Sequence, residues 1–128
     1  MGMPATVLIV DEELGFLLWL GAVLGEAGYR AVPAKAVTDG ARMARAFPPN
    51  VLVINPELHG AVKFIITLRT HNPDLKVIAL SDPTEAQENV IVVPKLTEIT
   101  AETRKRWLRA IENVLGARKV LHGGSSFS

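Results

Sequence analysis

The sequence VLVINPELHG, residues 51–60, contains the stretch that decides the fold. Four apolar residues, Val51 to Ile54, end at the polar side chain of Asn55, and Pro56 follows at once. A short continuous apolar run of this kind is typical of a strand buried on both faces, as in a parallel sheet. Such a strand places the neutral side-chain amide of Asn55 at the carboxyl edge of the sheet. Proteins with open parallel α/β sheets bind their ligands at this edge.

Similar short runs occur on both sides of this stretch, and we predict strands at 6–10, 29–32, 51–54, 76–80 and 90–93. Apolar residues at helical spacing predict helices over about 16–27, 38–46, 62–70 and 100–115. Thr38 or Asp39 and Thr100 are expected to cap two of these helices, and Gly28 and Gly116 to end two. This alternation predicts a single doubly wound α/β domain with five parallel strands.

The alternation fails once, between the fourth and fifth strands. Only residues 82–89, DPTEAQEN, separate Ser81 from the fifth strand. A crossover helix of ordinary length, about 8–20 residues, does not fit there together with its turns. We therefore expect the fourth crossover helix to be missing or much shortened.

Composition narrows the functional classes. The chain has 128 residues, a formal net charge of +1 and no cysteine, which excludes disulfides, thiolate metal sites and a cysteine nucleophile. The near balance of charge argues against nucleic acid as a partner. No apolar run approaches the roughly 20 residues that span a bilayer, and acidic residues come too early for a secretory signal. We expect a cytoplasmic domain over 1–119, without membrane contact, and a flexible tail over 120–128.

Polar side chains follow four of the predicted strands, at ends that meet on one edge of a parallel sheet. Carboxylates favour a hard cation such as Mg²⁺, whereas a lysine and a hydroxyl suit phosphoryl oxygens. Together they predict a cation-and-phosphate site built from Asp11, Glu12, Glu13, Asn55, Ser81, Asp82 and Lys95.

On these residues the chain resembles a response-regulator receiver domain, with the flavodoxin-like (CheY-like) fold and strand order 2-1-3-4-5. The resemblance extends over about residues 7–115 and rests on the segments LIVDEE, EAGY, PPNVLVIN, VIALS and VVPK. In that family an acidic pair binds Mg²⁺, and an aspartate that ends the third strand accepts a phosphoryl group from a histidine kinase. The resemblance implies that Asp11 and Glu12 are the acidic pair and that Asn55 stands at the acceptor position.

The resemblance also implies that Ser81 and Lys95 are the hydroxyl and the lysine that respond to the phosphoryl group. Two further positions depart from the family pattern. Asp82 stands where a small residue is usual, and Val92 occupies the aromatic switch position. Lys95 is therefore expected to pair with Asp11 or Asp82 rather than with phosphate.

Asn55 is the decisive departure, because an amide lacks the carboxylate oxygen that acts as the nucleophile. It also removes one negative charge, so Mg²⁺ should bind only weakly at Asp11 and Glu12. We predict a degenerate receiver, or pseudo-receiver, that is not an enzyme and requires no cofactor. It would act in two-component signalling as a phosphorylation-independent module for a protein partner such as a histidine kinase.

Two alternatives stay open from the sequence. The domain could bind a ligand or metal in the vacated acidic pocket, or it could be a phosphorelay component phosphorylated elsewhere, for which Glu57 and His59 are poor candidates. Leu14, Leu17 and Leu18 fall outside the apolar stripe of the first helix and predict an interface. A homodimer would then form through the first helix or through the basic last helix.

Overall fold

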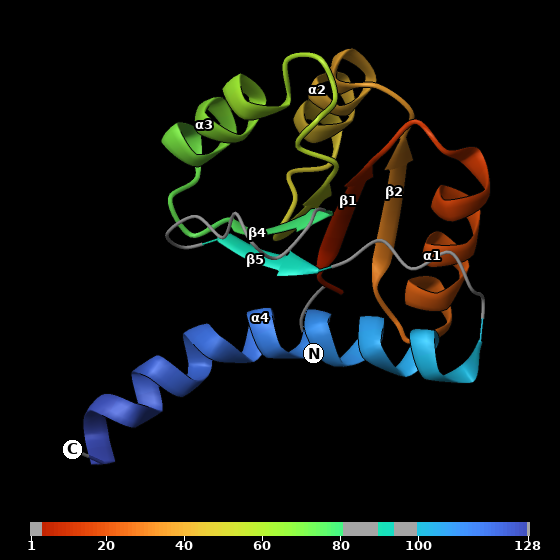
Figure 1. The fold of residues 1–128 in the computed structure, drawn as a ribbon. Helices are drawn as coiled ribbons and strands as arrows, with labels where there is room; N and C mark the ends of the chain where they lie inside the picture. The colour runs from red at the N-terminus through yellow and green to blue at the C-terminus, as the bar shows by residue number, and fades with distance from the viewer. Residues whose placement is uncertain (1–3, 81–89, 94–99, 128) are drawn as a thin grey trace.

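The structure is a computed structural model that describes residues 4–80, 90–93 and 100–127, with side chains described over 4–80 and 100–116. Strands and helices alternate along residues 6–80, and two helices cover each face of the sheet, α1 and α4 on one and α2 and α3 on the other (Figure 1). The elements are β1 (Thr6–Val10), α1 (Leu14–Glu26), β2 (Arg30–Ala34), α2 (Val37–Ala46), β3 (Val51–Ile54), α3 (Ala61–His71), β4 (Lys76–Leu80), β5 (Val90–Val93) and α4 (Ala101–Phe127).

The sheet is parallel throughout its described strands. The predicted order 2-1-3-4 of the first four strands is confirmed, and β5 pairs with β4 at the edge. In the register of β1 and β3, Val10 lies opposite Ile54, so the residues that follow both strands emerge side by side. The expected loss of a fourth crossover helix concerns residues 81–89, which lie outside the described part of the chain.

Each of the strands β1 to β4 contributes to two cores because successive side chains point to opposite faces. In β1, Val7 and Ile9 join the cluster under α1 and α4, whereas Leu8 and Val10 join the cluster under α2 and α3. All four are essentially inaccessible. This burial on both faces explains why the strands are continuous apolar runs rather than alternating ones.

Two of the expected helix caps had different outcomes. The Oγ1 of Thr100 accepts a hydrogen bond from the Thr103 backbone N–H (3.2 Å), which confirms the predicted cap of α4. In α2 the prediction of Thr38 or Asp39 as the cap was wrong, since the helix begins at Val37, after Ala36, without a side-chain cap. Asp39 instead accepts a hydrogen bond from Arg42 on the exposed face (2.7 Å).

The expected end of the last helix at Gly116 was also wrong, because α4 continues to Phe127. One glycine inside a helix costs only about 1 kcal/mol relative to alanine, and helix formers follow it in the segment ARKVL, residues 117–121. Figure 1 shows this last part of α4 extending beyond the sheet. The division of the chain at residue 119 stays a prediction.

Helix α1 is apolar on all sides, with no polar or charged residue from Leu14 to Gly25. The prediction that Leu17 lies outside the core-facing stripe was wrong, since Leu17 is 1% exposed and packs in the core. The periodic pattern is uninformative here because it needs polar residues to mark the outer face. Leu14 and Leu18, in contrast, are 52% and 61% exposed.

Helix α4 is held against the sheet by Trp107, Ile111 and Val114, all buried in the same cluster as α1. The Trp107 ring lies 5.9 Å from the Phe16 ring. Tyr29, directly before β2, packs at the border of this cluster. Within the described residues no helix is both long and apolar enough to cross a membrane.

The Tyr29 hydroxyl makes stability depend on pH at the alkaline end. Burial, and then the negative charge of Glu112, raise the pKa of Tyr29 above its ordinary 10.0. A group whose pKa is higher in the folded state gives full stabilisation below its unfolded pKa and loses it as the pH rises through the folded value. We therefore expect the urea midpoint to fall above about pH 10. Tyr29→Phe should remove part of that fall, and parallel curves for both proteins would contradict the expectation.

Candidate functional site

The carboxyl edge of the sheet brings Asp11 and Asn55 together. The Asp11 N–H donates to the Ala34 carbonyl (3.1 Å) and the Asn55 N–H to the Val10 carbonyl (3.0 Å), so both residues continue the ladder of the sheet. Asp11 is completely buried and Asn55 is half-buried. The sequence predicted that these two side chains would meet at one edge, and the structure places them there.

The Asn55 side chain uses both ends of its amide. Its Nδ2 donates to Oδ1 of Asp11 (3.1 Å), and its Oδ1 accepts from the backbone N–H of Glu57 (2.9 Å). The orientation of the amide is fixed by its partners, because a carboxylate oxygen only accepts and a backbone N–H only donates. A flipped amide would place two acceptors together on one side and two donors on the other.

The loop after Asn55 is short and tightly hydrogen-bonded. The Leu58 N–H donates to the Asn55 carbonyl (3.2 Å), and α3 begins after Gly60, whose φ of +79° favours glycine. The side chains of Glu57 and His59 are exposed in this loop. The amide of Asn55 therefore ties the buried end of β1 to the first residues of the loop before α3.

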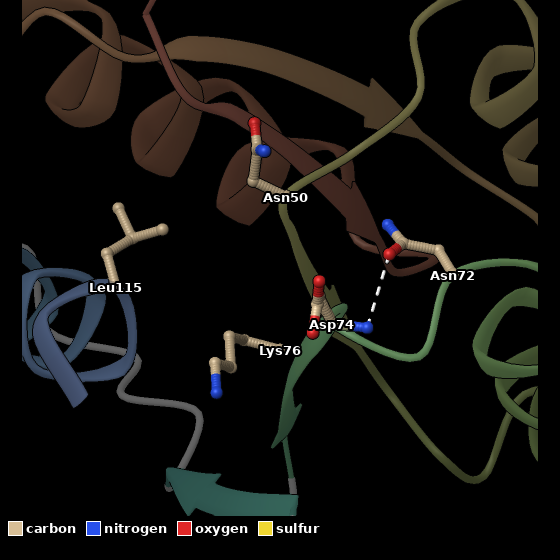
Figure 2. Close-up of a pocket in the computed structure, with 5 residues that line it drawn as sticks. All are labelled: Asn50, Asn72, Asp74, Lys76 and Leu115. Carbon is tan, nitrogen blue, oxygen red and sulfur yellow. Dashed lines mark hydrogen bonds between the residues drawn. The ribbon is translucent and has the colours of Figure 1, made fainter. Parts of the chain in front are cut away.

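Sequence reasoning missed Asn50, which lies at the opposite edge, where β3 begins. Its Oδ1 accepts from the Thr6 N–H (2.7 Å), and its backbone N–H donates to the Thr6 carbonyl (2.8 Å). A pocket of about 140 Å³ lies there. It is lined by Asn50, Asn72, Asp74, Lys76 and Leu115 (Figure 2). The side-chain oxygen of Asn72 likewise accepts a hydrogen bond from the Asp74 backbone N–H (3.2 Å). The amide oxygens of Asn50 and Asn72 therefore both hold backbone segments in place. The only sequence signal was a polar residue directly before an apolar run.

Comparison with known proteins places the fold. No family model matches the chain. It is 30% identical over 83 residues to the photosynthetic apparatus regulatory protein RegA of Rhodovulum sulfidophilum and 26% identical to RegA of Cereibacter sphaeroides. Each match covers 63% of this chain, and the chain spans 45% of the length of each of these relatives.

Solved structures match over most of the chain. The chemotaxis protein CheY4 of Vibrio cholerae has a TM-score of 0.71 at 16% identity and covers 87% of this chain and 98% of its own. A receiver domain protein of Clostridium thermocellum has a TM-score of 0.69 at 18% identity over 91% and 98%. NtrX of Brucella abortus in complex with ATP has a TM-score of 0.76 at 16% identity, over 98% of this chain and 30% of its own.

This is the CheY-like receiver fold. The prediction of an α/β domain of this type is confirmed. The resemblance to receiver domains places Mg²⁺ and the phosphoryl group at the carboxyl edge of the sheet. Of the residues predicted for this edge, the structure describes Asp11, Glu12, Glu13 and Asn55, and Glu13 lies exposed directly before α1.

These side chains do not fit the Mg²⁺ ion of a phosphorylated receiver. Asp11 offers a buried carboxylate, but Glu12 is exposed, and Asn55 turns its NH₂ group toward Asp11 and its oxygen toward the loop. A hard cation needs oxygen ligands that converge on one point. Among the described residues no group of three or more Asp, Glu, His or Cys side chains could hold a metal.

The structure describes only part of the other residues that the resemblance predicts for this site. Ser81, Asp82 and Lys95 lie outside the described residues, so their roles stay predictions. Val92 lies in β5 opposite Ala79, at the position that the resemblance assigns to the aromatic switch.

Proposed function

We propose that this chain serves two-component signalling as a receiver domain that recognises its protein partner without phosphorylation at the third-strand position. The observation that carries the proposal is the Asn55 amide, which is hydrogen-bonded to Asp11 on one side and to the loop before α3 on the other. The likeness in sequence to two regulatory proteins supports a regulatory role.

The chemistry at position 55 argues against phosphoryl transfer there. An acyl phosphate forms when a carboxylate oxygen attacks phosphorus, and an amide offers no such nucleophile. The amide oxygen of Asn55 already accepts the Glu57 N–H, and its nitrogen donates to Asp11. The hydrogen bond to Asp11 also does part of what a cation does in other receivers, because it gives the buried carboxylate a donor.

The same contacts weaken the alternative of a ligand or metal in the acidic pocket. A metal or a small anion in the acidic pocket would have to displace the Asn55 amide from Asp11, and no described side chain offers a replacement set of ligands. The domain is thus best understood as a fixed surface for a cytoplasmic signalling protein, such as a histidine kinase.

We expect no covalent phosphate on this chain after incubation with acetyl phosphate and Mg²⁺, as measured by intact mass. A receiver that carries the aspartate serves as the positive control for the reagent. Asn55→Asp is expected to gain a partial adduct, because it restores a carboxylate beside Asp11 and Glu12. A stoichiometric, hydroxylamine-sensitive adduct on the unaltered chain would overturn the proposal.

A further inference from the structure

The outer face of α1 carries a stripe of apolar and small residues that the core does not use. Leu14 and Leu18 are 52% and 61% exposed, Gly25 is exposed and Gly21 is half-buried. Their spacings of four, three and four residues place them on one face of the helix. No polar side chain interrupts the helix between Leu14 and Gly25, so nothing on this face favours water as a neighbour.

The order of these residues makes the stripe complementary to itself. In an antiparallel pair of α1 helices related by a two-fold axis between residues 19 and 20, Leu14 of one copy faces Gly25 of the other. Leu18 then faces Gly21 in the same way. Among the described residues nothing lies within 4 Å of a Cβ placed at Gly21 or Gly25. Each copy thus presents two large side chains to two flat, open positions of its partner.

The two ends of α1 carry charged residues that an antiparallel pair would bring together. Glu12 lies before the helix and is exposed. At the other end the Arg104 guanidinium lies 2.9 Å from the Glu26 carboxylate. An antiparallel pair brings Glu12 and Glu13 of one copy to the end where the Arg104–Glu26 ion pair of the other copy lies, so Arg104 is the cation that offsets the acidic groups meeting there. In the antiparallel pair the two helix dipoles point in opposite directions, which is the favourable orientation. In a parallel pair the dipoles would point the same way, and leucine would face leucine.

We propose that this stripe, Leu14, Leu18, Gly21 and Gly25, is the surface on which a second copy of this chain docks, with the two α1 helices antiparallel. The contact is isologous, so it closes at a dimer. One helix pair buries less than the roughly 1,200 Å² of a standard stable interface. The dimer is therefore weak, with a Kd of roughly 10–100 µM.

Sedimentation of the full chain across concentrations tests this surface, and α3 supplies a closely matched control. Ile66 and Val62 on α3 are 61% and 53% exposed, the same values as Leu18 and, within one per cent, Leu14. We expect Leu18→Glu to weaken self-association at least tenfold and Ile66→Glu to leave it unchanged. Thermal midpoints of both variants confirm that they are folded. A chain that stays monomeric at about 300 µM, or equal losses in both variants, would overturn the proposal.

The antiparallel direction has its own test, because the chain has no native cysteine. A chain with Leu18→Cys is mixed with one that carries Gly21→Cys, and the disulfides formed under mild oxidation are counted. The antiparallel pair predicts that the mixed disulfide forms fastest, since a disulfide needs Cα atoms within about 7 Å. Faster Leu18→Cys homodisulfides would show a parallel pair and refute the proposed arrangement. Neither test involves phosphate, so its outcome is separate from that of the phosphorylation experiment.

Discussion

Trp107→Ala is expected to lower the free energy of unfolding by about 3–5 kcal/mol. The Trp107 side chain is completely buried in the cluster that joins α4 to α1 and the sheet, 5.9 Å from the Phe16 ring. Its removal leaves a large cavity at the centre of the contact that holds α4. Because domains of this size are stable by only about 5–15 kcal/mol, the loss should be evident in a urea titration.

Trp107→Phe separates the effect of lost side-chain volume from the effect of the buried indole N–H. The indole Nε1 of Trp107 is buried and has no hydrogen-bond partner among the described residues. A buried donor without a partner costs about 1–3 kcal/mol, and phenylalanine removes that donor while keeping a ring. We expect Trp107→Phe to cost less than about 1.5 kcal/mol. Equal losses for the two variants would contradict the assignment of the Trp107 effect to packing.

Asn55→Asp is expected to destabilise the fold by about 2–3 kcal/mol in the absence of divalent cations. The hydrogen bond from Asn55 Nδ2 to Asp11 would become a contact between two acidic groups, one of them completely buried. Chemical denaturation in EDTA at neutral pH measures the change. The loss should shrink when about 10 mM Mg²⁺ is added, because a cation bound only by the folded variant stabilises it.

Asn50→Asp is the matched control at the opposite edge of the sheet. The Oδ1 of Asn50 accepts a backbone hydrogen from Thr6, a role that a carboxylate also fills. Its stability should therefore change by no more than about 0.5 kcal/mol, without dependence on Mg²⁺. If Asn55→Asp proved as stable as the unaltered chain in EDTA, the Asn55–Asp11 contact would not matter in the way proposed.

The strands could be predicted well because their signal is local. β1, β3, β4 and β5 begin and end at the predicted residues, since each is a continuous apolar run bounded by polar or turn residues. The meeting of Asp11 with Asn55 followed from the same reasoning, because carboxyl ends of parallel strands share an edge. What local pattern could not give was the direction of the Asn55 amide, which is set by Asp11 on one strand and Glu57 in a loop.

The errors arose where a residue's environment depends on distant neighbours. Leu17 was assigned to the outside of α1, although the helix offers no polar residue to mark that side. Gly116 was expected to stop α4, although a single glycine is a weak stop when helix formers follow it. Asn50 was overlooked because its role is a hydrogen bond to Thr6, which is remote in sequence.

The double use of the Asn55 amide also bears on how such a domain changes over generations. Codons for asparagine and aspartate differ by a single base, so one mutation can place an acid at this position. The protein would nevertheless resist that step, because the two neighbours of the amide require both a donor and an acceptor at its tip. An acid at position 55 therefore becomes tolerable only together with a cation that offsets its charge beside Asp11. The change from asparagine to aspartate is thus a single mutation for the gene, but it lowers the stability of the fold.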